Sequence, residues 1–150
     1  MITLARVRAE AAKAVAEMGR GFSYTDGQSV ECMYRKMNVG EFRSSSHGGG
    51  TYRMGEGPTL TPCIIGRILE SLNLMTNHIR ECTSSVSGLF GSGNSVVGRG
   101  PYYGLFEPLA VLYMNNLQVA QDSGRVWGAV YDLAERLIEI ELEYQRMRRK

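Results

Sequence analysis

Residues 108–150 contain two stretches of helical periodicity, and no other part of the chain restricts the fold as strongly. Apolar residues recur at helical spacing over residues 109–120, after Pro108, which suits the first turn of a helix. The pattern stops at Gly124, because glycine favours the backbone conformation that ends a helix. We therefore expect a C-terminal helical hairpin whose second helix begins near Arg125 and is capped by a polar residue of the corner.

The second helix carries two apolar stripes. One suits the chain's own core and consists of Trp127, Val130, Tyr131, Ala134 and Ile138. The other is spaced alternately by four and three residues, as in a heptad repeat, and consists of Val126, Val130, Leu133, Leu137, Ile140, Tyr144 and Met147. A helix that is apolar on two sides usually has two partners. We therefore expect a homodimer with an interface formed by Leu133, Leu137, Ile140, Tyr144 and Met147; the alternative is that one monomer buries both stripes, as helical bundles do.

The composition indicates one domain over residues 1–150, because a chain of this length can bury a sizeable core. A net charge of +2 disfavours nucleic acid as a partner. The three cysteines lack CxxC spacing, which is typical of reduced thiols and predicts neither a metal nor another cofactor. No long apolar span and no signal-like N-terminus are visible, so we expect a cytoplasmic protein without a membrane partner.

The N-terminal half predicts one more long helix and a small sheet. Residues 1–18 have helical periodicity and end at Gly19. The pair Asp26-Gly27 favours a hairpin turn before an alternating run at residues 30–35, and a third strand is expected near residues 51–54. The predicted fold class is therefore α+β: a mainly helical single domain with a small antiparallel β-hairpin sheet and the C-terminal helical hairpin.

Two glycine-rich stretches, residues 41–50 and 88–104, are predicted to be flexible loops. The second contains Arg99, Tyr102 and Tyr103, and a guanidinium group beside two aromatic rings can stack a base. We take these three residues as a candidate ligand-binding site for a nucleotide-like molecule. The alternative is a solvent-exposed loop whose tyrosines fold back on the helices.

Catalysis is not favoured by the residues present. A helix is expected to start at Thr61-Pro62, which places Cys63 at its N-terminus, where a thiol can be reactive and His78 could act as its base. Cys63 precedes two isoleucines, however, so burial in the core is the preferred interpretation. A DNA-binding regulator is a further alternative, because the corner before Trp127 loosely resembles a helix-turn-helix, but its second helix lacks exposed base-reading residues.

Three short motifs occur in a familiar order. They are Cys32-Met33-Tyr34, then residues 62–69 (Pro-Cys-Ile-Ile-Gly-Arg-Ile-Leu), then residues 117–128 with Gln121-Asp122 and Trp127-Gly128. With these motifs the chain resembles a group of small uncharacterised proteins of actinobacteria and their phages, over residues 22–134. The resemblance implies a source and a fold but no chemistry. The two glycine-rich loops are longer in this chain than the pattern of the group predicts.

These observations lead to a functional hypothesis. We expect a non-catalytic binding protein that forms a homodimer, and the resemblance implies a phage accessory protein that engages a host protein. Sequestration of a small nucleotide-like molecule by Arg99, Tyr102 and Tyr103 is the first alternative, and DNA binding is the second.

Overall fold

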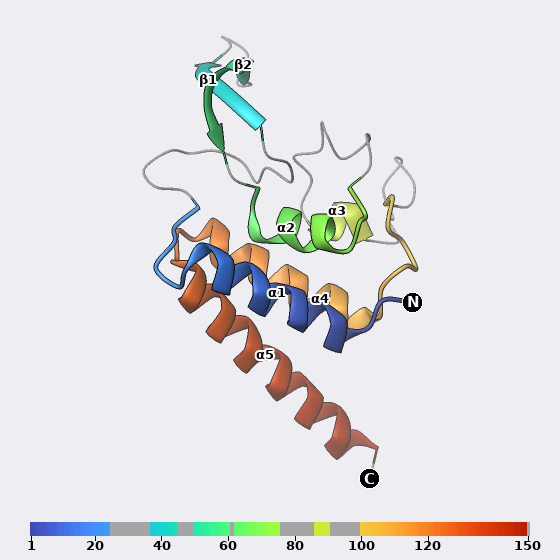
Figure 1. Cartoon of the computed structure of the whole chain (residues 1–150). Coiled ribbons are helices and arrows are strands. Elements are labelled where there is room, and N and C mark those ends of the chain that lie inside the picture. Colours follow the sequence, from blue (N-terminus) through green and yellow to red (C-terminus); the bar gives the residue numbers. More distant parts are fainter. Residues whose placement is uncertain (25–36, 45–49, 61, 76–85, 91–99, 150) are drawn as a thin grey trace.

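The computed structural model describes residues 1–24, 37–44, 50–60, 62–75, 86–90 and 100–149. In chain order, the elements in these ranges are α1 (Leu4–Met18), β1 (Met37–Ser44), β2 (Gly50–Leu60), α2 (Ile64–Ser71), α3 (Val86–Phe90), α4 (Pro108–Asp122) and α5 (Trp127–Arg148). Helices α1 and α4 lie side by side; α2 contacts both of them, and α5 contacts both from another side (Figure 1). None of the described helices combines the length and the apolar character needed to cross a membrane.

The predicted α+β class is wrong, and the protein belongs to a helical class, because helices form the layers around the core. Strands β1 and β2 pair with each other as an antiparallel ribbon, with Phe42 opposite Tyr52. Residues 51–54, predicted as a third strand, belong to this ribbon, and the predicted turn at residues 26–27 lies outside the described residues. A two-stranded ribbon is marginally stable alone, so the helices carry the fold.

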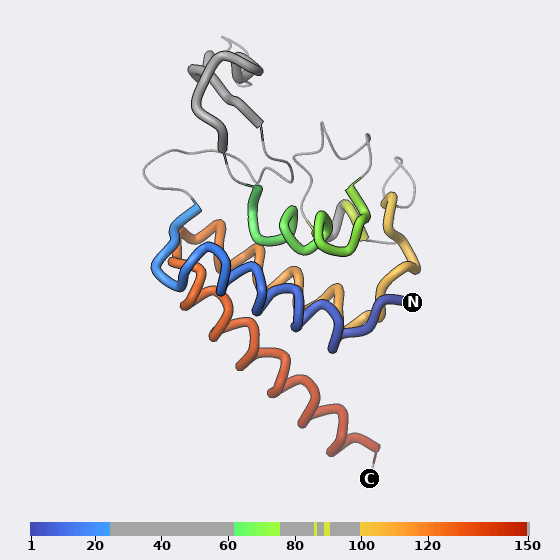
Figure 2. The backbone as a smooth tube through the Cα atoms, viewed as in Figure 1, coloured from blue at the N-terminus to red at the C-terminus, as the bar shows by residue number. Residues whose placement is uncertain are grey.

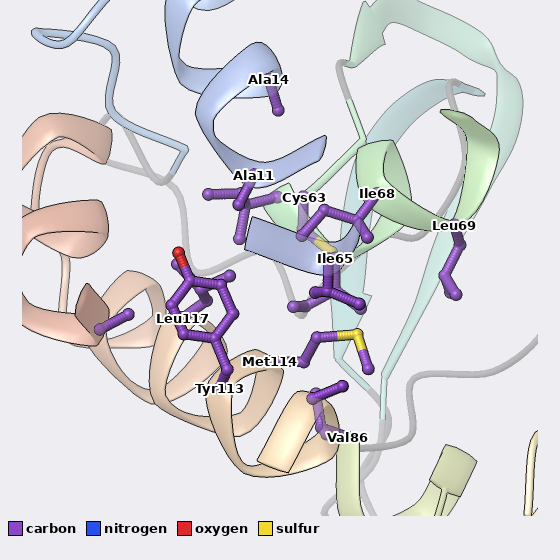
Figure 3. Close-up of a cluster of buried hydrophobic side chains, with 14 of the residues drawn as sticks. Ala11, Ala14, Cys63, Ile65, Ile68, Leu69, Val86, Tyr113, Met114 and Leu117 are labelled. Carbon is purple, nitrogen blue, oxygen red and sulfur yellow. The ribbon is translucent and has the colours of Figure 1, made fainter. Parts of the chain in front are cut away.

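The core is a single cluster of side chains from all five described helices and from the segment before α4, part of which is drawn in Figure 3. The small side chains of Ala11 and Ala14 allow α1 to lie close to α2, whose Ile65 and Ile68 are fully buried. Trp127 of α5 is the largest fully buried side chain. Burial of one large apolar side chain stabilises a fold by about 1.5–3 kcal/mol, so these contacts dominate the stability of the helical body.

Side chains on or just before α4 cap the N-termini of α1, α2 and α3. Glu107 Oε2 accepts a hydrogen bond from the Leu4 amide of α1 at 2.8 Å. Gln121 Oε1 accepts one from the Ile64 amide of α2 at 2.9 Å, and Gln118 Oε1 accepts one from the Val86 amide of α3 at 2.6 Å; neither bond is exposed to solvent. The first amides of a helix have no partner within it, so these three bonds also fix where each helix starts. The capping residues are Glu107, Gln118 and Gln121.

The corner between α4 and α5 has the predicted glycine, since Gly124 has a φ of 79°. Helix α5 begins at Trp127, two residues after the predicted start near Arg125, and its N-cap residue Val126 makes no side-chain cap. The α5 amides are satisfied from elsewhere: the Trp127 amide donates to the Phe22 carbonyl and the Gly128 amide donates to the Arg20 carbonyl, each at 2.8 Å. The segment after α1 therefore replaces the predicted polar cap.

The N-terminus of the chain lies beside the segment that leads into α4 (Figure 2). Ile2 forms a parallel bridge with Phe106, through bonds from the Ile2 amide to the Leu105 carbonyl at 2.8 Å and from the Glu107 amide to the Ile2 carbonyl at 2.9 Å. Helix α1 then starts behind Thr3, whose hydroxyl accepts from the Arg6 amide. The helix predicted for residues 1–18 is confirmed, with its end at Gly19.

Parts of both predicted loops belong to regular elements. Residues 41–44 lie in β1 and residue 50 in β2, while residues 45–49 lie outside the described part. Residues 88–90 lie in α3, and residues 101–104 lie in turns. Helix α2 also starts later than predicted, at Ile64 instead of Pro62.

Candidate functional site

Of the three predicted ligand-binding residues, the structure describes Tyr102 and Tyr103. Arg99 lies outside the described residues. Tyr102 is 4% exposed, its ring packs 5.4 Å from that of Phe90, and its hydroxyl donates to the Leu74 carbonyl. Tyr103, the next residue, is 43% exposed. Tyr102 therefore serves the core, and its ring faces are covered by neighbouring side chains instead of being open for stacking.

The candidate nucleophile Cys63 is fully buried. It is the N-cap of α2, and its Sγ accepts a hydrogen bond from the Gly66 amide at 3.4 Å. The preferred interpretation of the sequence, a packed thiol, is confirmed. The proposed base His78 lies outside the described residues, as does His47.

A polar cluster that the sequence analysis missed joins α1, α4 and α5. Glu135 of α5 is at its centre: its Oε1 accepts a hydrogen bond from the Tyr113 hydroxyl at 2.7 Å and one from Arg8 Nε at 3.2 Å. Arg8 also pairs with Glu139 at 2.8 Å, one turn further along α5. Tyr113 lies 22 positions and Arg8 lies 127 positions before Glu135, so no local pattern in the sequence reveals the cluster.

The electrostatics of this cluster favour a structural role. Burial raises the pKa of the Tyr113 hydroxyl above its usual value, and the hydrogen bond to Glu135 raises it further. The pKa of the Arg8 guanidinium is also raised, chiefly by its hydrogen bond to Glu135. Both groups therefore keep their protons near neutral pH, and general acid–base catalysis needs a group that titrates there. The cluster joins three helices through charge-assisted hydrogen bonds.

A shallow open groove lies between α1 and α2. Arg67 of α2 reaches Glu17 of α1 at 3.1 Å across it, and Lys13 and Glu70 lie along its edges. Among the described residues, no group of three or more His, Cys, Asp or Glu side chains is placed to hold a metal ion.

The second apolar stripe of α5 is exposed in the single chain. We use the term seam for Leu133, Leu137, Ile140, Tyr144 and Met147. Leu133 packs partly against the core, but the other four are 40%, 55%, 49% and 62% exposed in chain order. The alternative of a monomer that buries both stripes therefore does not hold for the described structure, whereas the core stripe at Trp127, Val130, Ala134 and Ile138 is fully buried.

The seam extends beyond the helical body. Ile138 is the last buried residue of α5, and the helix continues to Arg148. Figure 1 shows this final part of α5 diverging from α1 and α4 toward the C-terminus. Four charged residues flank the seam, Arg136 and Glu143 on one side and Glu141 and Arg148 on the other. Surface apolar residues in a contiguous row with a charged rim are typical of an interaction site.

Comparisons with known proteins add no family to this geometry: no family model, no curated protein and no solved structure matches the chain.

Proposed function

We propose that this chain is a non-catalytic binding protein that acts through the seam, by pairing with an amphipathic helix. One observation carries the proposal: four apolar residues of the seam stay exposed on a helix whose core-facing residues Trp127, Val130, Ala134 and Ile138 are fully buried. Apolar residues at heptad spacing fit into the face of another helix with the same spacing. The seam therefore has the chemistry of a helix-binding surface.

The rest of the described structure supports binding over catalysis. The thiol of Cys63 is buried, and the carboxylate of Glu135 is engaged by Arg8 and Tyr113. From the resemblance to phage proteins we propose in addition that the partner is a host protein or that the paired chain engages one. The small-ligand alternative is weaker, because Tyr102 is part of the core.

A photocrosslinking experiment tests the proposal. Tyr144, which is 49% exposed on the seam, is replaced by a photoreactive phenylalanine analogue in the full chain, and Val119, which is 62% exposed on α4, is replaced in a control. We expect a protein adduct from position 144 and none from position 119. The adduct should disappear when Ile140→Lys is added, because a lysine charge within the seam cannot be buried cheaply against an apolar partner.

The outcome that contradicts the proposal is equally specific. If position 144 gives no more adduct than position 119, in the purified chain and in host cells, the seam is not a binding surface. An adduct that survives Ile140→Lys also contradicts it. Circular dichroism of the variants checks that the helical fold is retained.

A further inference from the structure

We propose that the seam binds a second copy of this chain, in parallel and in register. This inference rests on the proposed function and names its partner. We compare three alignments of two seams: parallel in register, parallel with a shift of one heptad, and antiparallel with residues 137–147 overlapping. The charges that flank the seam distinguish among them.

The alternating spacing assigns each seam residue to a heptad position. Leu137 and Tyr144 take the a position, and Leu133, Ile140 and Met147 take the d position. The flanking g positions are then Arg136 and Glu143, and the flanking e positions are Glu141 and Arg148. In a parallel coiled coil, a g residue faces the e residue five positions later on the partner helix.

In the parallel in-register pair, every flanking contact joins opposite charges. Arg136 meets Glu141 of the second copy, and Glu143 meets Arg148 of the second copy. Two-fold symmetry repeats both contacts on the other side of the seam. Within the described part of the chain, the ion pairs found involve neither Arg136, Glu143 nor Arg148. Glu141 accepts a hydrogen bond from Gln145 with one oxygen, Oε1.

The other two alignments bring like charges together. A shift of one heptad places Arg136 opposite Arg148 of the second copy and Glu143 opposite Glu141. An antiparallel pair that overlaps the seam from Leu137 to Met147 has its symmetry axis at residue 142. Glu141 then lies close to Glu141 of the second copy, and Glu143 lies close to Glu143 of the second copy. Like-charge contacts at such positions select against an alignment.

Charge exchange in the full chain tests the alignment, with dimer dissociation constants measured by analytical ultracentrifugation. Arg136→Glu alone should weaken the dimer about tenfold, because two attractive contacts become repulsive. Glu141→Arg alone should have a similar effect. The double variant Arg136→Glu/Glu141→Arg should return to within about threefold of the unmodified chain, because it restores the attraction between positions 136 and 141 of the in-register pair. The single variants exclude the shifted pair, in which Arg136→Glu would replace an Arg–Arg contact by an attractive one and tighten the dimer. The two positions are five residues apart, so they do not contact each other on one helix.

The failures of the two proposals give different results. If the chain dimerises but the double variant is no tighter than the single variants, the parallel alignment is wrong and the proposed function stands. If the chain stays monomeric while position 144 crosslinks to another protein, the second copy is the wrong partner. Added salt should weaken the dimer of the unmodified chain, since its flanking contacts are exposed ion pairs.

Discussion

The most informative change in the helical body is Gln121→Leu. The Gln121 side chain is 1% exposed, and its Oε1 accepts the hydrogen bond from the fully buried Ile64 amide. Leucine has a similar size but no acceptor. The substitution therefore keeps the packing of α4 while it leaves the first amide of α2 without this partner.

The magnitude follows from that lost bond. A buried donor without a partner costs about 1–3 kcal/mol, and the apolar leucine side chain offsets a part of this cost. We expect the free energy of unfolding to fall by about 1–2 kcal/mol, which corresponds to a drop in melting temperature of about 3–6 °C for a chain of this size. Urea denaturation followed by circular dichroism measures the first quantity. Hydrogen exchange should show faster exchange of the Ile64 amide.

Gln145→Leu is the matched control, because Gln145 is only partly buried and bonds to Glu141 on the surface of α5. Its effect should stay within about 0.5 kcal/mol. Both variants are compared at one protein concentration, since association also stabilises a fold. If Gln121→Leu changes stability no more than Gln145→Leu does, the capping bond from α4 does not stabilise α2.

Three further changes test other parts of the fold. Gly128→Ala should lower stability by about 1–3 kcal/mol, because the new Cβ would lie 2.9 Å from the Arg20 carbonyl oxygen. Thermal melts measure the effect, and the control is Gly21→Ala, where a new Cβ meets nothing within 4 Å. Asp122→Asn should raise stability at pH 7 by less than about 0.5 kcal/mol, because desolvation raises the pKa of this exposed carboxyl at the C-terminal end of α4 while a hydrogen bond with Gln121 lowers it. The gain should vanish on acidification below its ordinary pKa of 3.8. Tyr113→Phe should cost about 1–2 kcal/mol at pH 7 through loss of the bond to Glu135. Because the pKa of Tyr113 is raised in the folded state, the unmodified chain should lose stability above about pH 10. Urea titrations should therefore show that the difference in free energy of unfolding between the unmodified chain and Tyr113→Phe becomes smaller above this pH.

The helical part of the fold was predictable where the signal is local. The spacing of apolar residues gave α1, α4 and α5, and Gly19 and Gly124 marked helix ends, since both have positive φ. The two stripes of α5 were also separable by spacing alone. The strand prediction relied on the Asp26-Gly27 pair, and the described strands β1 and β2 pair further along the chain.

The bonds that position the helices were not predictable, because their partners are far apart in sequence. Gln118 and Gln121 read as ordinary polar positions of a helix, and only the fold places them at the N-termini of α3 and α2. Glu135 likewise looked like one acid in a charged run, although it bonds to Tyr113 and Arg8. For Tyr102 the sequence left two interpretations open, and the structure agrees with the alternative in which its ring packs on the helices, since the side chain is buried in the core.

The division of α5 into two stripes separates stability from association. The side that holds Trp127 and Ile138 is buried in the helical body, while Ile140 and Met147 are more than half exposed and contribute little to the core of one chain. Removal of apolar surface from the buried side should therefore lower the free energy of unfolding whatever the partner. Removal from the four exposed seam residues, Leu137, Ile140, Tyr144 and Met147, should leave the folded monomer nearly unchanged and act on the complex. A seam residue whose substitution unfolds the monomer would show that the exposed stripe supports the fold itself, and the case for a binding surface would lose its physical basis.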